Sequence, residues 1–319
     1  MNAWIQRLQQ LLRVVLSLAV AGYWARAGQL ALGLAVGTLL FFAYAWFLLG
    51  AFFSLRRINQ SPSDGRPSWG TLLRAWWREL PACERVFSWW QPFAAQAVAD
   101  ALPAPPARQR GVLLIHGFSC NRGLWNEWMR RLRAKGHPYI ALTLTPEFGG
   151  IDRYADPIEA AVQRLTAACG GTPPLVVAHS MGGLAVRAWW RRHGHNDQRA
   201  RVQRVLTLGT PHAGTVMAEL STTRNARQMR RHSAWLQELA SHERLNEGDC
   251  QIAAHLDCYF SACDQVVCPA QTAVLPGARA IEIPAAGHLS LVFEPRVFAD
   301  ALAYLAQPLN DARRQAAAA

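Results

Sequence analysis

The segment Pro173–Gly183 (PPLVVAHSMGG) constrains the fold of this chain more than any other stretch. Its apolar run, Leu175–Ala178, is bounded by prolines and glycines, which is typical of a strand buried on both faces of a parallel sheet. The residues that follow, Met181–Trp190, have the composition of a helix packed closely on a sheet. Ser180 lies in the sharp turn between them, at a helix N-terminus, where its hydroxyl would be exposed. The segment therefore predicts a nucleophilic serine.

Residues around the serine support this interpretation. Ala178 and Gly182 lie two positions before and after Ser180, and both are small enough for a tight turn. A serine–x–glycine sequence also occurs by chance in loops, but here a strand, a turn and an apolar helix follow one another in the order that such a turn requires.

From Gly111 onward, apolar strand-like segments alternate with helix-like segments. The expected strands are Val112–Ile115, Tyr139–Leu144, Leu175–Ala178, Val202–Leu208, Ile252–Phe260 and Ala278–Ile283. The expected helices are Leu124–Lys135, Pro157–Cys169, Met181–His193 and Pro295–Ala306. This alternation predicts an α/β domain over residues 111–308, built on a mostly parallel, doubly wound sheet with helices on both faces. Residues 210–246 interrupt the pattern and are interpreted as a small cap, and residues 309–319 as a tail.

Residues 1–55 are interpreted as a membrane anchor. Residues 30–53 contain no charged side chain and, at 24 residues, exceed the ~20 needed to cross a bilayer. Residues 8–25 form a second apolar segment, in which Arg13 could extend to the membrane interface. The expected arrangement is a helical hairpin; the alternative is a single anchor with the enzyme in the periplasm.

Charge distribution indicates the side of the membrane. Arg7, Arg13, Arg56 and Arg57 would flank one side and Arg26 the other, so the positive-inside tendency places the catalytic domain in the cytoplasm. Seven cysteines without a C-x-x-C motif are interpreted as thiols in a reducing compartment, although one disulfide remains open. The net charge of +12 comes from scattered arginines, which gives no reason to expect nucleic-acid binding.

Residues 56–110 are interpreted as a linker that carries an amphipathic helix and the start of the sheet, at residues 89–93. In the helix, Thr71–Leu80, the apolar stripe contains two tryptophans, whereas Arg74, Arg78 and Glu79 lie off the stripe. Tryptophan-rich amphipathic helices favour the bilayer interface. Packing of this helix on the catalytic domain is the equally open alternative.

A serine nucleophile needs a base, and the base needs an acid that orients it. The histidines after Ser180 are His193, His195, His212, His232, His242, His255 and His288. His288 is the expected base because it follows the last strand in a loop of small residues. His212, which directly follows another strand, is its rival.

The expected acid is Asp264, which follows the strand at residues 252–260 and lies in a loop at the carboxyl end of the sheet. Asp257 and Glu282 lie inside expected strands, where a carboxylate is more often paired or at the surface. Chain order, with the serine first, the acid next and the histidine last, agrees with this assignment.

The reaction also needs hydrogen-bond donors for a tetrahedral oxyanion. The backbone N–H groups of Met181 and Phe118 are the expected donors, and Gly117 allows the backbone to approach closely. His116 and His179 are interpreted as structural supports, together with Gly182 in the turn.

The motifs LLIHGFSCNRGLW, VVAHSMGGLAVR, LGTPHAGT, SACDQVVCP and IPAAGHLSL resemble the α/β-hydrolase superfamily. Within it, they are most similar to bacterial triacylglycerol lipases and esterases, and the LGTPHAGT segment is similar to that of GPI inositol-deacylase-like lipases. The resemblance covers residues 111–306 and implies the same roles for Ser180, Asp264, His288, Phe118 and Met181. It does not extend to residues 1–100, whose anchor departs from secreted lipases and indicates the bacterial inner membrane.

The expected function is hydrolysis of lipid or other acyl esters by a membrane-anchored serine hydrolase through an acyl-enzyme intermediate, without metal or organic cofactor. A thioesterase, a peptidase or an acyltransferase would use the same triad. A membrane scaffold with a non-catalytic hydrolase-like domain is the alternative from another class. The oligomeric state does not follow from the sequence.

Overall fold

A computed structural model of the chain describes residues 2–59, 66–194, 201–245 and 252–309. Six parallel strands form one sheet in the order β2-β1-β3-β4-β5-β6. The strands are β1 (Val112–Ile115), β2 (Tyr139–Ala141), β3 (Leu175–His179), β4 (Arg204–Leu208), β5 (Leu256–Phe260) and β6 (Arg279–Glu282). The expected parallel sheet of an α/β domain is confirmed.

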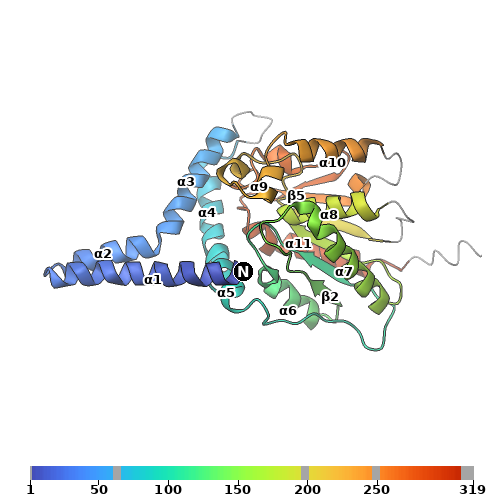
Figure 1. Cartoon of the computed structure of the whole chain (residues 1–319), viewed down its shortest axis with the longest axis horizontal. Coiled ribbons are helices and arrows are strands. Elements are labelled where there is room, and N and C mark those ends of the chain that lie inside the picture. The colour runs from blue at the N-terminus through green and yellow to red at the C-terminus, as the bar shows by residue number, and fades with distance from the viewer. Residues whose placement is uncertain (1, 60–65, 195–200, 246–251, 310–319) are drawn as a thin grey trace, which may run out of the picture.

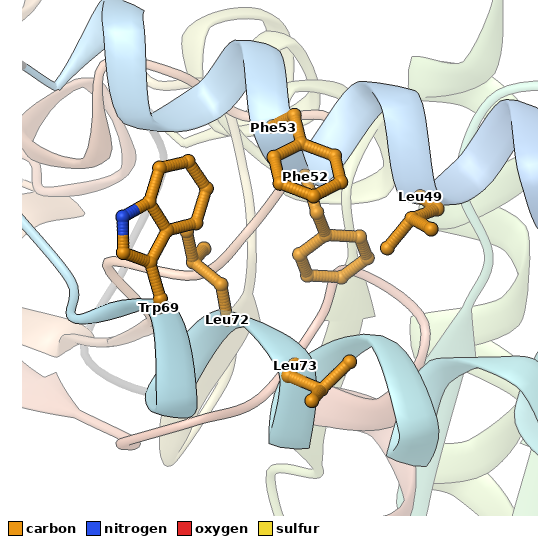
Figure 2. A pocket seen from close by; sticks show the side chains of 6 residues that line it. All are labelled: Leu49, Phe52, Phe53, Trp69, Leu72 and Leu73. Atoms are coloured by element: carbon orange, nitrogen blue, oxygen red, sulfur yellow. The ribbon is translucent and has the colours of Figure 1, made fainter.

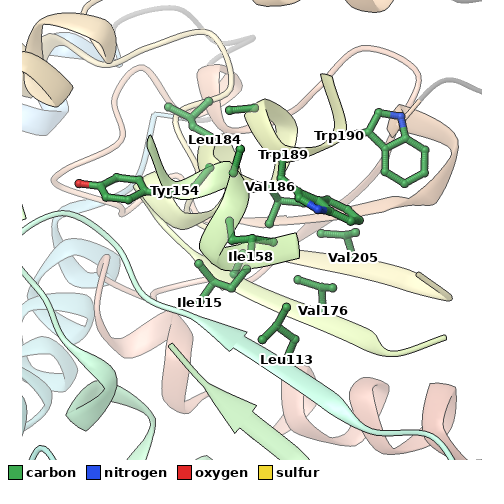
Figure 3. Close-up of a cluster of buried hydrophobic side chains, with 14 of the residues drawn as sticks. Leu113, Ile115, Tyr154, Ile158, Val176, Leu184, Val186, Trp189, Trp190 and Val205 are labelled. Carbon is green, nitrogen blue, oxygen red and sulfur yellow. The ribbon is translucent and has the colours of Figure 1, made fainter. Parts of the chain in front are cut away.

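Helices cover both faces of the sheet because neighbouring residues of a buried strand point to opposite faces. Leu113, Val176 and Val205 pack on one face against α7 (Ala155–Ala168) and α8 (Met181–His193), as Figure 3 shows. The next residues along the same strands, such as Leu114 and Val177, pack on the other face against α6 (Asn126–Ala134) and α11 (Pro295–Ala306).

Two expectations for single segments are wrong. Residues 89–93 do not begin the sheet, because they belong to a π-helical turn, η2 (Glu84–Trp90), and a short helix, α5 (Gln91–Phe93). The strand expected from Ile252 begins at Leu256 instead, after a 3-10 turn, η8 (Ile252–His255). An apolar run does not separate a strand from a buried helical turn, so the pattern alone extended this strand too far.

The expected cap is largely helical. It consists of η6 (Val216–Leu220), α9 (Arg224–Gln228) and α10 (Ala234–Leu245), and the expected boundary, Asn246, lies outside the described residues. Asn225 of α9 contacts the sulfur of Met181, which places the cap beside the turn that carries Ser180.

The N-terminal region consists of α1 (Asn2–Arg26), α2 (Leu30–Phe41), α3 (Ala43–Ile58) and α4 (Trp69–Cys83). Figure 1 shows α1 and α2 side by side, projecting away from the α/β body, with α3 and α4 between this hairpin and the body. By length and composition, α1 is the helix in the described residues that could cross a membrane by itself, and α2 with α3 would be a second span if the pair counts as one.

Small residues bring α1 and α2 into close contact. A Cβ atom on Gly33 would lie 2.7 Å from the backbone oxygen of Ala21, and one on Gly37 would lie 2.8 Å from that of Ser17. Glycines spaced four residues apart, facing small residues on the partner helix, are the packing that apolar helices use when the hydrophobic effect does not drive them together.

The helix expected over residues 30–53 is broken at Phe42, where α2 and α3 meet at 54°. Arg13 of α1 lies opposite the break and donates a hydrogen bond to the carbonyl oxygen of Phe41 (2.7 Å). Its guanidinium also pairs with Glu84 at 3.1 Å. Arg13 is therefore held by partners within the protein.

The amphipathic helix α4 has two differently used faces. Trp69, Leu73 and Trp77 are exposed, whereas Leu72 and Glu79 are buried against the α/β body. Packing on the catalytic domain is thus confirmed for one face of this helix, whereas the bilayer interface stays a prediction for its exposed face. Glu79 lies on the packed face, although it is off the apolar stripe of the sequence.

The described cysteines are unpaired: Cys83, Cys120, Cys169, Cys258, Cys263 and Cys268. All of them except the half-buried Cys83 are buried, as expected for thiols in an apolar environment. Cys250 lies outside the described residues.

Candidate active site

Ser180 lies between the end of β3 and the first residue of α8, and its backbone has φ 55° and ψ −129°. A positive φ is strained for a residue with a Cβ atom and is characteristic of a nucleophile turn between strand and helix. The Ser180 N–H donates to the carbonyl oxygen of Leu208 on the neighbouring strand β4 (2.8 Å), which fixes the turn on the sheet.

Close packing around the turn requires small residues. A Cβ atom on Gly182 would lie 2.7 Å from the carbonyl oxygen of His116, so Gly182 lets α8 approach the loop after β1. On the other side, Thr210 donates its hydroxyl to the carbonyl oxygen of Ser180 (2.9 Å). No local pattern predicts this contact of Thr210, since it joins two loops that are distant in the chain.

The loop after β1 lies directly against the serine. A Cβ atom on Gly117 would be 2.6 Å from Cβ of Ser180, so a side chain at position 117 is incompatible with this arrangement. His116 holds the loop: its Nε2 accepts the N–H of Leu144 (2.9 Å), and its Nδ1 lies 2.8 Å from the carbonyl oxygen of Gly117. Burial lowers the pKa of His116 to about 4, which keeps the ring neutral and fits a structural role.

The two expected oxyanion donors, Phe118 and Met181, directly follow Gly117 and Ser180, the two residues that approach each other here. The Met181 N–H is the first amide of α8 and, like other first-turn amides, has no acceptor within its own helix. Phe118 follows Gly117 and packs edge-to-face on Phe148, with ring centroids 5.7 Å apart. Positive helix-terminal potential at Met181 favours an anion at this place.

Asp264 and His288 form a buried pair. Oδ2 of Asp264 accepts a hydrogen bond from Nδ1 of His288 at 2.8 Å. The other carboxylate oxygen accepts the backbone N–H groups of Val266 and Val267, at 2.9 and 2.8 Å. A Cβ atom on Gly209, the residue after Leu208, would lie 2.7 Å from Oδ2 of Asp264 and 3.1 Å from Nδ1 of His288. The pair is therefore adjacent to the strand end that binds Ser180.

Electrostatics distinguish His288 from the other buried imidazoles. Burial by itself would lower the pKa of His288, but the Asp264 carboxylate, its hydrogen bond and the charge of Glu79 outweigh it and raise the pKa. His179 lies with its ring centroid 4.6 Å from that of His288, and burial together with the charge of His288 puts the pKa of His179 well below the usual range. Of these two rings, His288 is the one suited to accept a proton.

The rival residues have other partners in the described part of the chain. His212 contacts the hydroxyl of Thr207 (3.2 Å), and burial puts its pKa well below the usual range. Asp257 accepts hydrogen bonds from Arg204 and, at 2.6 Å, from Tyr304, as expected for a paired carboxylate in a strand. Glu282 is exposed on β6, and His195 lies outside the described residues.

Two further buried residues lie at the site and were not predicted from the sequence. Glu79 of α4 accepts hydrogen bonds from the backbone N–H groups of Leu289 (2.7 Å) and Ser290 (2.8 Å), directly after His288. Gln265 links Glu79 to the backbone N–H of His288. A glutamate next to an apolar stripe is ordinarily solvated, so no local pattern marks it. Among the described residues, no three His, Cys, Asp or Glu side chains are placed to hold a metal ion.

Residues 112–249 match the model of a family described as the alpha/beta hydrolase family. Among solved structures, the Bacillus licheniformis lipase BlEst2 in its mature form is similar with a TM-score of 0.54 and 16% identity, over 65% of this chain and 96% of that one. Aspergillus fumigatus lipase B is similar with a TM-score of 0.53 and 17% identity, over 68% of this chain and 58% of that one. No curated protein sequence matches the chain. At these identities the likeness shows the fold, which is the α/β-hydrolase fold.

Proposed function

We propose that this chain, a lipase/esterase-like protein of the α/β-hydrolase fold, is a membrane-anchored serine hydrolase that cleaves carboxylic esters of lipids or other acyl compounds. The observation that carries the proposal is the strained serine at the β3–α8 turn, together with a buried Asp264–His288 pair beside it. Ser180 would be the nucleophile, His288 the base and Asp264 the acid that orients the base.

In the proposed mechanism, Oγ of Ser180 attacks the ester carbonyl while its proton passes to Nε2 of His288. The negative charge on the carbonyl oxygen would be stabilised by the N–H groups of Met181 and Phe118. The alcohol then leaves with the proton from His288, and an acyl-serine remains. Water attacks this ester and gives one proton to His288. His288 then returns that proton to Oγ of Ser180 as the carboxylic acid leaves, which regenerates both residues. Asp264 keeps the imidazole in the required tautomer and stabilises its charged form.

The proposed membrane attachment is supported by the distribution of exposed side chains. In the described chain, every exposed large hydrophobic residue except Leu102 and Leu220 lies between Trp4 and Phe93. Soluble monomers rarely expose large apolar patches, whereas a lipid bilayer would cover the apolar side chains of these helices. Trp4 and Trp24 are 20 residues apart along α1, which corresponds to ~30 Å of helix, the thickness of the hydrocarbon core.

Further apolar surface lies beside the catalytic domain. Figure 2 shows the pocket between α3 and α4, where Phe52 and Phe53 face Trp69 and Leu72. A bilayer in contact with these helices would be close to the catalytic loops on which α4 packs, which favours a lipid as substrate. The arginine distribution supports a catalytic domain in the cytoplasm, attached to the inner membrane of a bacterium.

The test is hydrolysis of p-nitrophenyl esters from short to long acyl chains by the full-length protein in mild detergent, with Ser180→Ala as its matched control. We expect activity that increases with chain length and is lost in the variant. A preference for short chains would point to a general esterase. Equal activity of Ser180→Ala would contradict the proposed nucleophile.

The alternative enzymes would use the same triad, and the scaffold alternative would not use the triad at all. Thioester, peptide and acyl-transfer substrates, tested with the same two proteins, separate the other acyl chemistries from ester hydrolysis. A fluorophosphonate probe tests the scaffold alternative, since an inert hydrolase-like domain would not be labelled at Ser180 when folded.

A further inference from the structure

Helix α4 lies outside the residues that match the hydrolase family model, yet it contacts both loops of the candidate triad. Cys263 and Cys268, which flank Asp264, pack against Leu72 and Ala75 of α4. On the histidine side, Arg78 donates to the carbonyl oxygen of Ala285 (3.0 Å). The helix is therefore part of the surroundings of the site, in addition to connecting the hairpin to the sheet.

Glu79 makes the closest of these contacts. Its side chain is 1% exposed, and its two carboxylate oxygens accept the N–H groups of Leu289 and Ser290, at 2.7 and 2.8 Å. A Cβ atom on Gly287 would lie 2.5 Å from Oε2 of Glu79, so the carboxylate lies directly on the backbone before His288. One side chain thus binds the backbone of the two residues after the histidine and lies against the residue before it.

A second connection passes through Gln265. Nε2 of Gln265 donates to Oε1 of Glu79 (3.0 Å), and Oε1 of Gln265 accepts the backbone N–H of His288 (3.1 Å). Since Gln265 directly follows Asp264, the same carboxylate sets the distance between the acid loop and the histidine loop. Leaving a buried carboxylate without its donors is costly. The Asp264 and His288 loops are therefore held in one relative position.

We propose that Glu79 is a positioning residue for the catalytic base, supplied to the hydrolase domain by the membrane-proximal helix α4. This inference rests on the proposed function of His288. It means that α4 performs two tasks with opposite faces: Trp69, Leu73 and Trp77 lie on the face proposed to meet lipid, while Glu79 orients the loop that carries the base.

The charged and titratable groups around His288 define the expected pH effect. Asp264 contacts the ring, His179 lies beside it with His116 behind, and Glu79 faces its backbone. Arg78 pairs with Glu294, which lies at the end of the loop, directly before α11. The negative charge of Glu79 adds to that of Asp264 in raising the pKa of His288, so removal of this charge lowers the pKa.

The test compares Glu79→Gln with the wild type, using the full-length protein in mild detergent and p-nitrophenyl butyrate. A glutamine has one acceptor oxygen where the loop needs two, so we expect kcat to fall about tenfold or more with little change in KM. The acid limb of the kcat/KM profile should move to lower pH, because a neutral His288 persists further into acid. Glu79→Asp, which keeps the charge, should restore the position of that limb.

Glu84→Gln is the matched control, because Glu84 lies five residues away and binds Arg13 rather than the histidine loop. It should leave kcat and the acid limb unchanged. Equal losses in both variants, with an unmoved acid limb and a lower Tm, would show a merely structural role and overturn the inference.

Histidine-selective NMR titration of His288 gives a readout that does not depend on turnover. An unchanged titration in Glu79→Gln would overturn the positioning role, even if no ester were hydrolysed. If the wild-type protein showed no Ser180-dependent hydrolysis, this would contradict the proposed function but not the positioning of His288 by Glu79.

Discussion

The α/β body and the N-terminal helices differ in the exposure of their apolar side chains. In the body, Leu113, Val176 and their neighbours are buried under helices on both faces of the sheet. In the hairpin, Leu16 and Leu18 are 58% and 68% exposed, and the helices touch each other through glycines. Water drives the first kind of packing, whereas the second kind is expected where lipid is the solvent.

Because the two regions are packed differently, we expect them to respond to different substitutions. Changes in the body should alter turnover and leave membrane binding intact, and changes in the hairpin should do the reverse. Glu79 is the expected exception, because it joins a helix of the first hundred residues to the catalytic loops.

The largest expected effect is that of Asp264→Asn. The amide oxygen can still accept the N–H groups of Val266 and Val267. The amide NH2 group, however, takes the place of Oδ2 and cannot accept a hydrogen bond from Nδ1 of His288, so the imidazole adopts the wrong tautomer. We expect kcat to fall on the order of 10⁴-fold. Flotation with phosphatidylethanolamine–phosphatidylglycerol vesicles should not change, and a parallel loss of flotation would break the separation of the two regions.

A smaller effect is expected for Leu18→Asp on the exposed side of α1. A carboxylate in the middle of a membrane helix costs about 3 kcal/mol, or on the order of 100-fold in partition between vesicles and water. Leu220→Asp is the matched control, because Leu220 is 77% exposed on the cap and needs no lipid cover. Flotation measured after dilution from detergent should fall in the first variant and not in the second. Equal flotation of both would remove the evidence that α1 contacts lipid.

The smallest effect is expected at the joint between hairpin and body. Arg13→Ala removes the hydrogen bond to Phe41 and the ion pair with Glu84. Because the Glu84 side chain is 39% exposed, the loss should be about 1 kcal/mol, which lowers Tm by a few degrees. Arg26→Ala, at the exposed tip of the hairpin, serves as the control. A Tm that is equally low in both variants would show that the break at Phe42 does not depend on Arg13.

Local sequence determined the elements whose causes lie within a few residues. The turn at Ser180 follows from an apolar run, a small residue on each side and an apolar helix, all within Pro173–Gly183, and α8 and α11 begin and end where the pattern predicts. The parallel sheet follows in the same way from the alternation of strands and helices. Order along the chain and loop position predict Asp264 as the acid and His288 as the base, and the hydrogen bond between them is consistent with this prediction.

Only the tertiary structure decided which face of each helix is buried, and what is placed there. Periodicity shows that α4 has an apolar stripe, but Leu73 and Trp77 of that stripe are exposed while Glu79 is buried. The Glu79 carboxylate is stabilised by backbone N–H groups at Leu289 and Ser290, about 210 residues away, which no local pattern can reveal. The break at Phe42 likewise depends on Arg13 of another helix. Burial of a polar group is settled by its partners, and in this protein the partners are brought together by the fold.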